Sequence, residues 1–356
     1  MSGLVDWQLA GRIATAVAGQ GEPWDGPGEP ALREECGRAV RLVRRYTGLR
    51  PRARIPKAEL VDRAEWVHTN LESFRRLSAG LEERMAEHVR IADGSGPPGG
   101  VARAGAGVEV GLATGYLGQR VVGQYDVALI GPVRTPRLLF VGPNLASARK
   151  RLDVEHGLFL RWIAMHEATH ALQFAAVPWL REHIGGIAQE LFAAAAIEVK
   201  PSDLLKRLLR LDPRELMRSV TSGEIISVLW GPEQRVSMQR LAAAMTVVEG
   251  YAEHVMDAVG ERLDPAYAEL RRRLERDRDR RGLLDQIVSK LLGLDLKLAQ
   301  YRRGKAFCDQ IAAEAGIARL NRVWSGAEAL PSAEELDEPG RWLERVGPPR
   351  RLALLR

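Results

Sequence analysis

The chain has 356 residues, enough to bury a sizeable core as two average domains or one large one. Its 46% hydrophobic and 28% charged residues exclude a disordered or fibrous protein. The formal net charge of +6 is modest for this length. The two cysteines, Cys36 and Cys308, form no spacing motif, which favours a reduced, cytoplasmic protein.

The first 17 residues are amphipathic, because Asp6, Gln8 and Arg12 interrupt their apolar pattern. They indicate a short helix and not a signal peptide. No stretch reaches the roughly 18 consecutive apolar residues that a membrane span needs. We therefore expect a cytoplasmic protein with no membrane partner.

Helical periodicity of the apolar residues dominates the chain. It predicts helices over residues 5–18, 30–47, 58–92, 102–122, 155–176, 179–198, 233–259, 281–293 and 295–315. Gly107, Gly111 and Gly115 recur on one face of the fourth of these, which indicates close packing of two helix backbones. We expect an N-terminal helical region at 1–100 and the site within 101–356, together forming one compact unit.

One region breaks the helical pattern. The alternation in DVALIGP and RTPRLLFVGPN predicts paired strands at residues 126–131 and 137–141. The fold class that follows is mainly α with a small β-hairpin or sheet, in one large unit. These strands come directly before the helix that carries the strongest motif of the chain.

That motif is HEATH, within RWIAMHEATHALQF at residues 161–174. His166 and His170 are four residues apart, so both imidazoles project from one helix face and can share one metal ion. Glu167 is placed to take the proton of a water that zinc activates at neutral pH. The alternative is a pair of core histidines with polar partners.

Zinc needs at least one more protein ligand. Gln173 and Ala176 occupy the positions where a metzincin has Gly and His, which excludes that class. His183 is possible, although it follows Pro178 and is expected on the next helix, facing elsewhere. The better candidate lies in VVEGYAEHVMD, residues 247–257.

In that segment Glu249, Glu253 and Asp257 form a polar stripe on an otherwise apolar helix, as in the third-ligand helix of gluzincins. Carboxylates on an apolar face are costly to bury unless they are paired or bind a metal. We expect Glu249 to be the third ligand and Glu253 to accept a hydrogen bond from a ligand histidine. A solvated acidic face is the alternative.

Two further sets of residues leave their roles open. Hydrolysis of a carbonyl needs a donor for the developing oxyanion, and Tyr251, His254 and Tyr301 are the candidates, although each could also be structural. The arginine run at residues 271–281 is interleaved with three acids. It favours a solvated helix end over a nucleic-acid patch.

Several segments together resemble a family of zincin-like metallopeptidases from actinobacteria and Chloroflexi, whose members are also labelled coenzyme F-420 biosynthesis-associated proteins or hydrolases. The resemblance rests on VDWQLA at 5–10, VVGQYD at 121–126, LLFVGPN at 138–144, the stretch from Trp162 to His183, VVEGYAEHVMD at 247–257, and the segments at 292–311 and 321–336. It implies a mostly helical fold with a small sheet, and a zinc site at His166, Glu167, His170 and Glu249. Zincins also place a substrate-aligning edge strand close to the metal helix, as the order of strands here suggests; a plain structural hairpin is the alternative.

The function expected from these observations is a gluzincin-like peptidase that uses Zn²⁺ and acts on a peptide or protein substrate. The alternative is a zinc-containing scaffold or maturation partner that binds another protein without cleaving it. A groove wide enough for an extended peptide at the metal would discriminate between them. We expect no nucleic-acid partner, and the sequence leaves the oligomeric state open.

Overall fold

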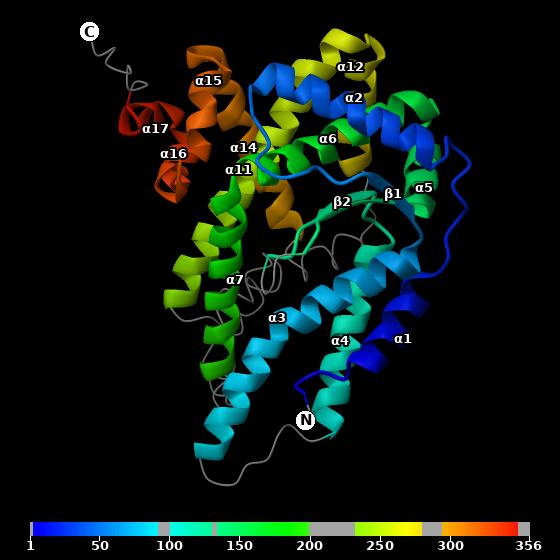
Figure 1. Ribbon diagram of the computed structural model, residues 1–356, viewed down its shortest axis with the longest axis vertical. Helices are drawn as coiled ribbons and strands as arrows, with labels where there is room; N and C mark the ends of the chain where they lie inside the picture. The colour runs from blue at the N-terminus through cyan, green and yellow to red at the C-terminus, as the bar shows by residue number, and fades with distance from the viewer. Residues whose placement is uncertain (1–2, 92–99, 130–133, 199–231, 280–293, 348–356) are drawn as a thin grey trace.

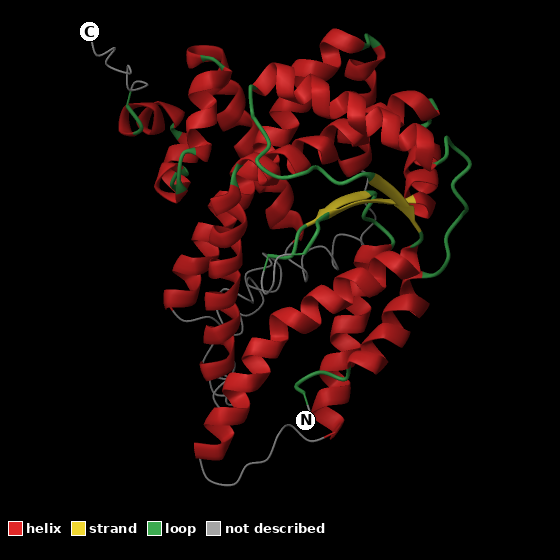
Figure 2. Cartoon of the chain, in the orientation of Figure 1, coloured by secondary structure: helices red, strands yellow, loops and turns green. Residues whose placement is uncertain are grey.

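The computed structural model describes residues 3–91, 100–129, 134–198, 232–279 and 294–347, and it is almost entirely helical around a small sheet (Figures 1 and 2). The N-terminal half contains α1 (Trp7–Ala18), α2 (Glu29–Thr47), β1 (Ala58–Val61), α3 (Arg63–Ile91), α4 (Gly100–Gly118), β2 (Gly123–Asp126), β3 (Arg137–Val141), α5 (Gly142–Leu152), α6 (His156–Ala176) and α7 (Pro178–Glu198). The rest contains α11 (Pro232–Leu263), α12 (Ala266–Asp279), α14 (Leu294–Ala315), α15 (Ile317–Leu320), η1 (Asn321–Trp324), η2 (Ala327–Ala329), α16 (Ala333–Asp337) and α17 (Pro339–Arg345). None of the helices described is both long and apolar enough to cross a membrane.

The three strands form one sheet in the order β1-β3-β2. β1 is parallel to the central strand β3, and β2 is antiparallel to it. The predicted strand at 137–141 is confirmed, but the prediction for 126–131 was wrong, because β2 lies earlier, at Gly123–Asp126. Residues 58–61, expected at the start of a long helix, form β1 instead, since their pairing with β3 overrides a helical apolar pattern.

The sheet separates two hydrophobic clusters. Leu138 and Phe140 of β3 face the larger cluster, around α2, α6 and α11, and Leu139 and Val141 face the smaller one, around α1 and α3. This alternation follows from the two-residue period of a strand that is covered on both faces. In Figure 1 the sheet lies between α6 above it and α3 with α4 below it.

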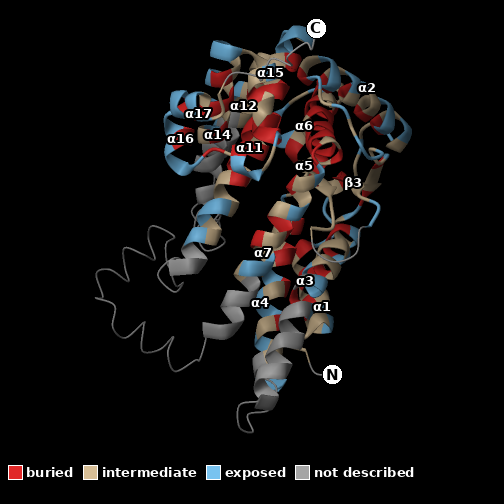
Figure 3. Cartoon of the chain, turned by 60° about the vertical axis from the view of Figure 1, so that its left-hand side comes forward, coloured by how far each residue is buried: buried red, intermediate tan, exposed pale blue. Residues whose placement is uncertain are grey.

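Helix α6 is the centre of the larger cluster. Glu155 caps the first turn of α6 by accepting hydrogen bonds from the backbone N–H groups of Gly157 and Leu158. The helix ends at Ala176, two residues before Pro178. Fifteen of its 21 residues are buried, which is the pattern of a helix covered on every side (Figure 3). α2 and α11 pack against it, so its side chains are held from several directions.

The described residues before position 92 pack against the rest of the chain, because β1 pairs with β3 and α2 packs on α6. The glycine stripe of α4 lies against α1, as predicted. A Cβ added at Gly107, Gly111 or Gly115 would lie 2.7–2.8 Å from a backbone oxygen at Asp6, Ala10 or Ala14. The helix predicted at residues 281–293 lies outside the described residues. The structure contains a helix in each of the other predicted ranges.

Candidate metal centre

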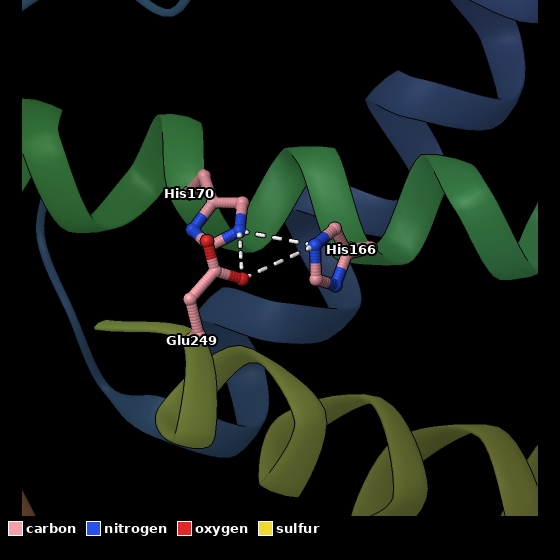
Figure 4. Close-up of side chains that lie close together, drawn as sticks. All are labelled: His166, His170 and Glu249. Atoms are coloured by element: carbon pink, nitrogen blue, oxygen red, sulfur yellow. Dashed lines mark hydrogen bonds and ion pairs between the residues drawn. The ribbon is translucent and has the colours of Figure 1, made fainter. Parts of the chain in front are cut away.

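The two histidines of the HEATH motif lie side by side on α6 (Figure 4). Their Nε2 atoms are 3.1 Å apart, and their rings are almost perpendicular, with centroids separated by 4.6 Å. Trp162, one turn earlier on α6, stacks on the ring of His166. The four-residue spacing therefore gives two nitrogen atoms that can bind one ion, as the sequence predicted.

Glu249 completes the group from α11, which runs beside α6 (Figure 4). Its Oε2 atom is 3.7 Å from Nε2 of His166 and 3.4 Å from Nε2 of His170. α11 is held by close packing on α14, where Gly250 meets the backbone of Gly304 with no room for a Cβ on either helix. The structure thus brings together three residues from positions 166, 170 and 249.

The spacing of these three atoms fits a zinc ion. Zinc holds nitrogen and carboxylate oxygen at about 2.0–2.2 Å, and tetrahedral angles then separate two ligand atoms by roughly 3.3 Å. The separations here are 3.1, 3.4 and 3.7 Å. Two imidazoles and one carboxylate are also a donor set that zinc prefers. Within the described residues, this is the one group of His, Cys, Asp or Glu side chains arranged to hold a metal.

Gln173 orients His170 and was not predicted as a site residue. It is fully buried, its Oε1 lies 2.9 Å from Nδ1 of His170, and its Nε2 donates to the backbone oxygen of Val248 at 3.0 Å. Since the amide oxygen can only accept, Nδ1 of His170 carries a proton, and Nε2 is the ring nitrogen left to bind a metal. The signal in the sequence was its position three residues after His170, on the same helix face.

Glu167 lies in a closely fitted place between α6 and the edge strand β2. It is 5% exposed, and its carboxylate accepts a hydrogen bond from the backbone N–H of Tyr125. A Cβ at Gly123 would lie 2.7 Å from Oε1 of Glu167, so only glycine leaves room for this carboxylate. Gly123 was also missed, although a glycine inside a strand often marks close approach of another group.

Burial controls the electrostatics of the site. It raises the pKa of Glu167 to about 7, against the opposing positive charge of His170. Burial lowers the pKa of His170, but the Glu249 carboxylate outweighs it and raises that pKa to about 9. The Glu249 carboxylate therefore favours positive charge at His170, which is the place a divalent cation would take.

The remaining acids of the predicted stripe belong to an ion-pair network. Glu253 accepts a hydrogen bond from Arg271 of α12, and Asp257 lies 3.2 Å from the same guanidinium and 3.0 Å from Lys305. Glu253 also lines the cavity beside Glu249. Its expected hydrogen bond to a ligand histidine stays a prediction, and the contact to His170 comes from Gln173. Arg271, expected on a solvated helix end, is largely buried in this network.

The structure brings neither Tyr251 nor His254 to the metal ligands. The hydroxyl of Tyr251, a fully buried residue, donates to Asn321 at 2.7 Å. The ring nitrogens of His254 lie 2.8 Å from the hydroxyl of Tyr46 and 2.7 Å from Asp309. These contacts point away from the cavity because α11 turns the two side chains to other faces than that of Glu249.

The remaining two candidates are Tyr301 and His183. The side chain of Tyr301, on α14, lies outside the described residues, so its predicted role stays a prediction. His183 lies on α7, with its ring edge against Trp179, and it does not line the cavity. The expectation that His183 faces elsewhere is confirmed.

A cavity of about 850 Å³ opens onto the side chains of His166, His170 and Glu249. Its floor is formed by α6 and α11, one wall by β2 with the residues that follow it, and the opposite end by α3. Close to the ligands the lining is mostly apolar, with Tyr125 stacked on Phe174. A space of this size accommodates several residues of an extended peptide.

The chain matches a family model described as zincin-like metallopeptidase over residues 5–343. It is also similar to a protein from Chloroflexus aurantiacus whose crystal structure is described, provisionally, as that of a hydrolase with a novel fold. The two share 32% sequence identity with a TM-score of 0.68, over 96% of this chain and 98% of the other. No curated protein matches this sequence. The family match covers nearly the whole chain, including the three residues of the candidate metal centre, and the chain therefore belongs to the zincin-like metallopeptidases.

Proposed function

We propose that this protein is a zinc-dependent peptidase in which His166, His170 and Glu249 hold the metal and Glu167 is the general base. The observation that carries the proposal is the convergence of the three ligand atoms within 3.1–3.7 Å, directly beside a buried carboxylate. Zinc held by this set would supply a water of lowered pKa and would polarise a carbonyl. The rest of the reaction follows from the side chains of the chain.

Glu167 is suited to moving a proton. A general base works best when its pKa lies near the operating pH, and burial raises that of Glu167 to about 7. The Tyr125 N–H fixes one side of the carboxylate and Gly123 leaves it room, so its position is set before substrate arrives. After taking a proton from the attacking water, Glu167 can pass it to the leaving amine.

β2 is suited to aligning the substrate. It is an edge strand, and Val141 N–H donates to Val122 O in the pairing with β3. Hydrogen bonds of successive residues alternate between the two sides of a strand, so the backbone groups of Gly123 and Tyr125 point to the free edge of β2. At that edge the N–H of Tyr125 already donates to Glu167. An extended peptide could pair there with the remaining backbone groups and lie across the metal ligands.

The first test compares bound zinc in purified wild type with that in Glu249→Gln and His166→Ala. Both variants are expected to lose most of the metal, because two protein ligands remain. Glu261→Gln, an exposed change on the same helix, is the matched control and is expected to keep it. Full zinc occupancy in Glu249→Gln would contradict the ligand assignment.

The second test separates a peptidase from a zinc-containing scaffold. Glu167→Gln removes the base but leaves the three ligands in place, so it is expected to keep zinc and to lose cleavage of labelled casein and of a peptide library. A wild-type protein that is zinc-loaded yet inert on all such substrates would contradict the peptidase function and favour the scaffold.

A further inference from the structure

The positive charge of this chain is concentrated in one segment. Residues 37–58 contain eight arginines and lysines and no acid. Since the whole chain has a net charge of +6, all other residues together carry −2. The segment comprises the second half of α2 and the connection from α2 to β1.

All eight side chains are exposed, and we call seven of them the basic surface: Arg41, Arg44, Arg45, Arg50, Arg52, Arg54 and Lys57. The eighth, Arg38, lies 3.8 Å from both Glu34 and Glu35. Among the residues that the structure describes, no acid pairs with any member of the basic surface. Arg137, by contrast, pairs with both Glu59 and Glu65.

The fold holds this segment in place and turns its charges outward. The buried face of α2, which includes Ala39 and Val43, packs into the core and leaves the arginines of the helix on the solvent side. Gly48 ends the helix in a left-handed conformation with φ of 71°. The connection that follows is fixed to the end of α6, where the N–H groups of Arg52 and Ala53 donate to the oxygen of Ala175.

The basic surface is separate from the metal centre. None of its residues lines the cavity. α2 lies across α6 at the top of Figure 1, while the sheet and the edge strand that borders the cavity lie on the other side of α6. A ligand of the basic surface is therefore a second partner of the molecule and not part of the substrate bound at the metal.

The chemistry of the surface selects the kind of partner. Six of its seven cations are arginines, whose planar guanidinium matches the two oxygens of a phosphate group better than the ammonium of lysine does. The apolar side chains among them, Leu49 and Ile55, are part-buried and packed on the core, so they are not available for insertion into a bilayer. No exposed aromatic ring lies among the cations to stack on a base.

We propose that the basic surface binds the phosphate backbone of double-stranded nucleic acid, without reading its sequence. A row of cations along a helix and the fixed connection after it suits a polymer with regularly repeated charges. Binding of this kind is driven by release of counterions and weakens steeply as salt rises. This proposal revises the expectation that nucleic acid is no partner. That expectation rested on the arginine run at residues 271–281, whereas the basic surface lies in the segment after Cys36.

The test measures fluorescence anisotropy of a labelled DNA duplex of about 20 base pairs with the zinc-loaded full chain, over a series of salt concentrations. If all seven cations contact phosphates, the slope of log affinity against log salt is about −6. The variant Arg44→Ala/Arg45→Ala/Arg50→Ala is expected to bind roughly a hundredfold more weakly at about 0.1 M salt, with a slope shallower by about 0.9 for each phosphate that is no longer neutralised.

The matched control is Arg12→Ala/Arg272→Ala/Arg302→Ala, which removes the same charge from exposed positions elsewhere and is expected to bind as the wild type does. Thermal unfolding of both variants checks that they fold. Equal loss of binding in the two variants would overturn the proposal. Binding to phosphatidylglycerol vesicles without binding to duplex would also overturn the proposal, because a membrane would then be the partner. Competition by polyglutamate as strong as that by DNA at equal charge would overturn it too, because an acidic protein would then be the partner.

Discussion

Gln173 provides the sharpest test of how this metal centre is built. Replacing it with leucine keeps the approximate volume of the side chain but removes two hydrogen bonds, the one at 2.9 Å to His170 and the one at 3.0 Å to Val248. The His170 ring then loses the acceptor that fixes its Nδ1 proton. The residue is fully buried, so water cannot replace that acceptor without opening the core.

The expected magnitude follows from the two hydrogen bonds. Loss of a hydrogen bond that orients a ligand histidine typically weakens metal affinity about 10- to 100-fold, which is about 1.4–2.8 kcal/mol. Removal of both hydrogen bonds is expected to lower the free energy of unfolding of the metal-free protein by about 1–3 kcal/mol. Zinc affinity is measured by competition with a fluorescent chelator, and stability by urea unfolding in the presence of EDTA.

Gln173→Glu separates orientation of the ligand from simple packing. A glutamate can still accept from Nδ1 of His170 but cannot donate to the oxygen of Val248. It is therefore expected to keep zinc affinity close to that of wild type while losing stability. If Gln173→Leu folds and binds zinc as tightly as wild type, or if both variants lose zinc equally, Gln173 does not act through His170.

Three further outcomes are expected. Gly123→Ala brings a methyl group to 2.7 Å from the Glu167 carboxylate, so peptide hydrolysis is expected to fall roughly tenfold or more with zinc content unchanged. The control is Gly186→Ala, where the added Cβ meets open space. Equal activity of the two variants would refute the close fit of Gly123 against Glu167. In metal-free protein the raised pKa of Glu167 means that the folded state holds a proton that the unfolded state releases, so stability falls as the pH rises from about 4.5 through 7. Glu167→Gln lacks this contribution. If the melting temperatures of the two proteins change equally with pH between pH 5 and 8, the raised pKa is contradicted. Burial raises the pKa of Cys36 to about 12 and that of Cys308 well above its usual range. Neither thiol is therefore expected to react with Ellman's reagent at pH 8 until denaturant is added. Rapid labelling of the native protein would show that these cysteines are not buried.

Local features of this chain were predicted from sequence because they depend on neighbours a few residues away. The pairing of His166 with His170 needs only the 3.6-residue period of one helix. The glycine stripe at 107, 111 and 115 and the strand at 137–141 are likewise periodic patterns. Glu249 was also proposed from its own helix, where a carboxylate on an apolar face required a partner.

Other features depended on contacts between distant segments. β1 forms because Ala58–Val61 lie beside β3, about 80 positions later, although the residues themselves continue a helical pattern. Glu253 pairs with Arg271 because α12 folds back on α11, and Gly123 matters only because β2 runs past Glu167. Each depends on the free energy of packing two elements together, which no local pattern encodes.

The difference between the two kinds of residue is physical. The sequence by itself determined which side chains share a helix face, since the period of the backbone decides that. Only the tertiary structure decided which faces meet: that Gln173 reaches His170, that Tyr251 and His254 bind other partners, and that the seven cations of the basic surface have no acidic partner among the described residues. A burial or a charge pair is a property of two segments, and it exists only once the fold has placed both.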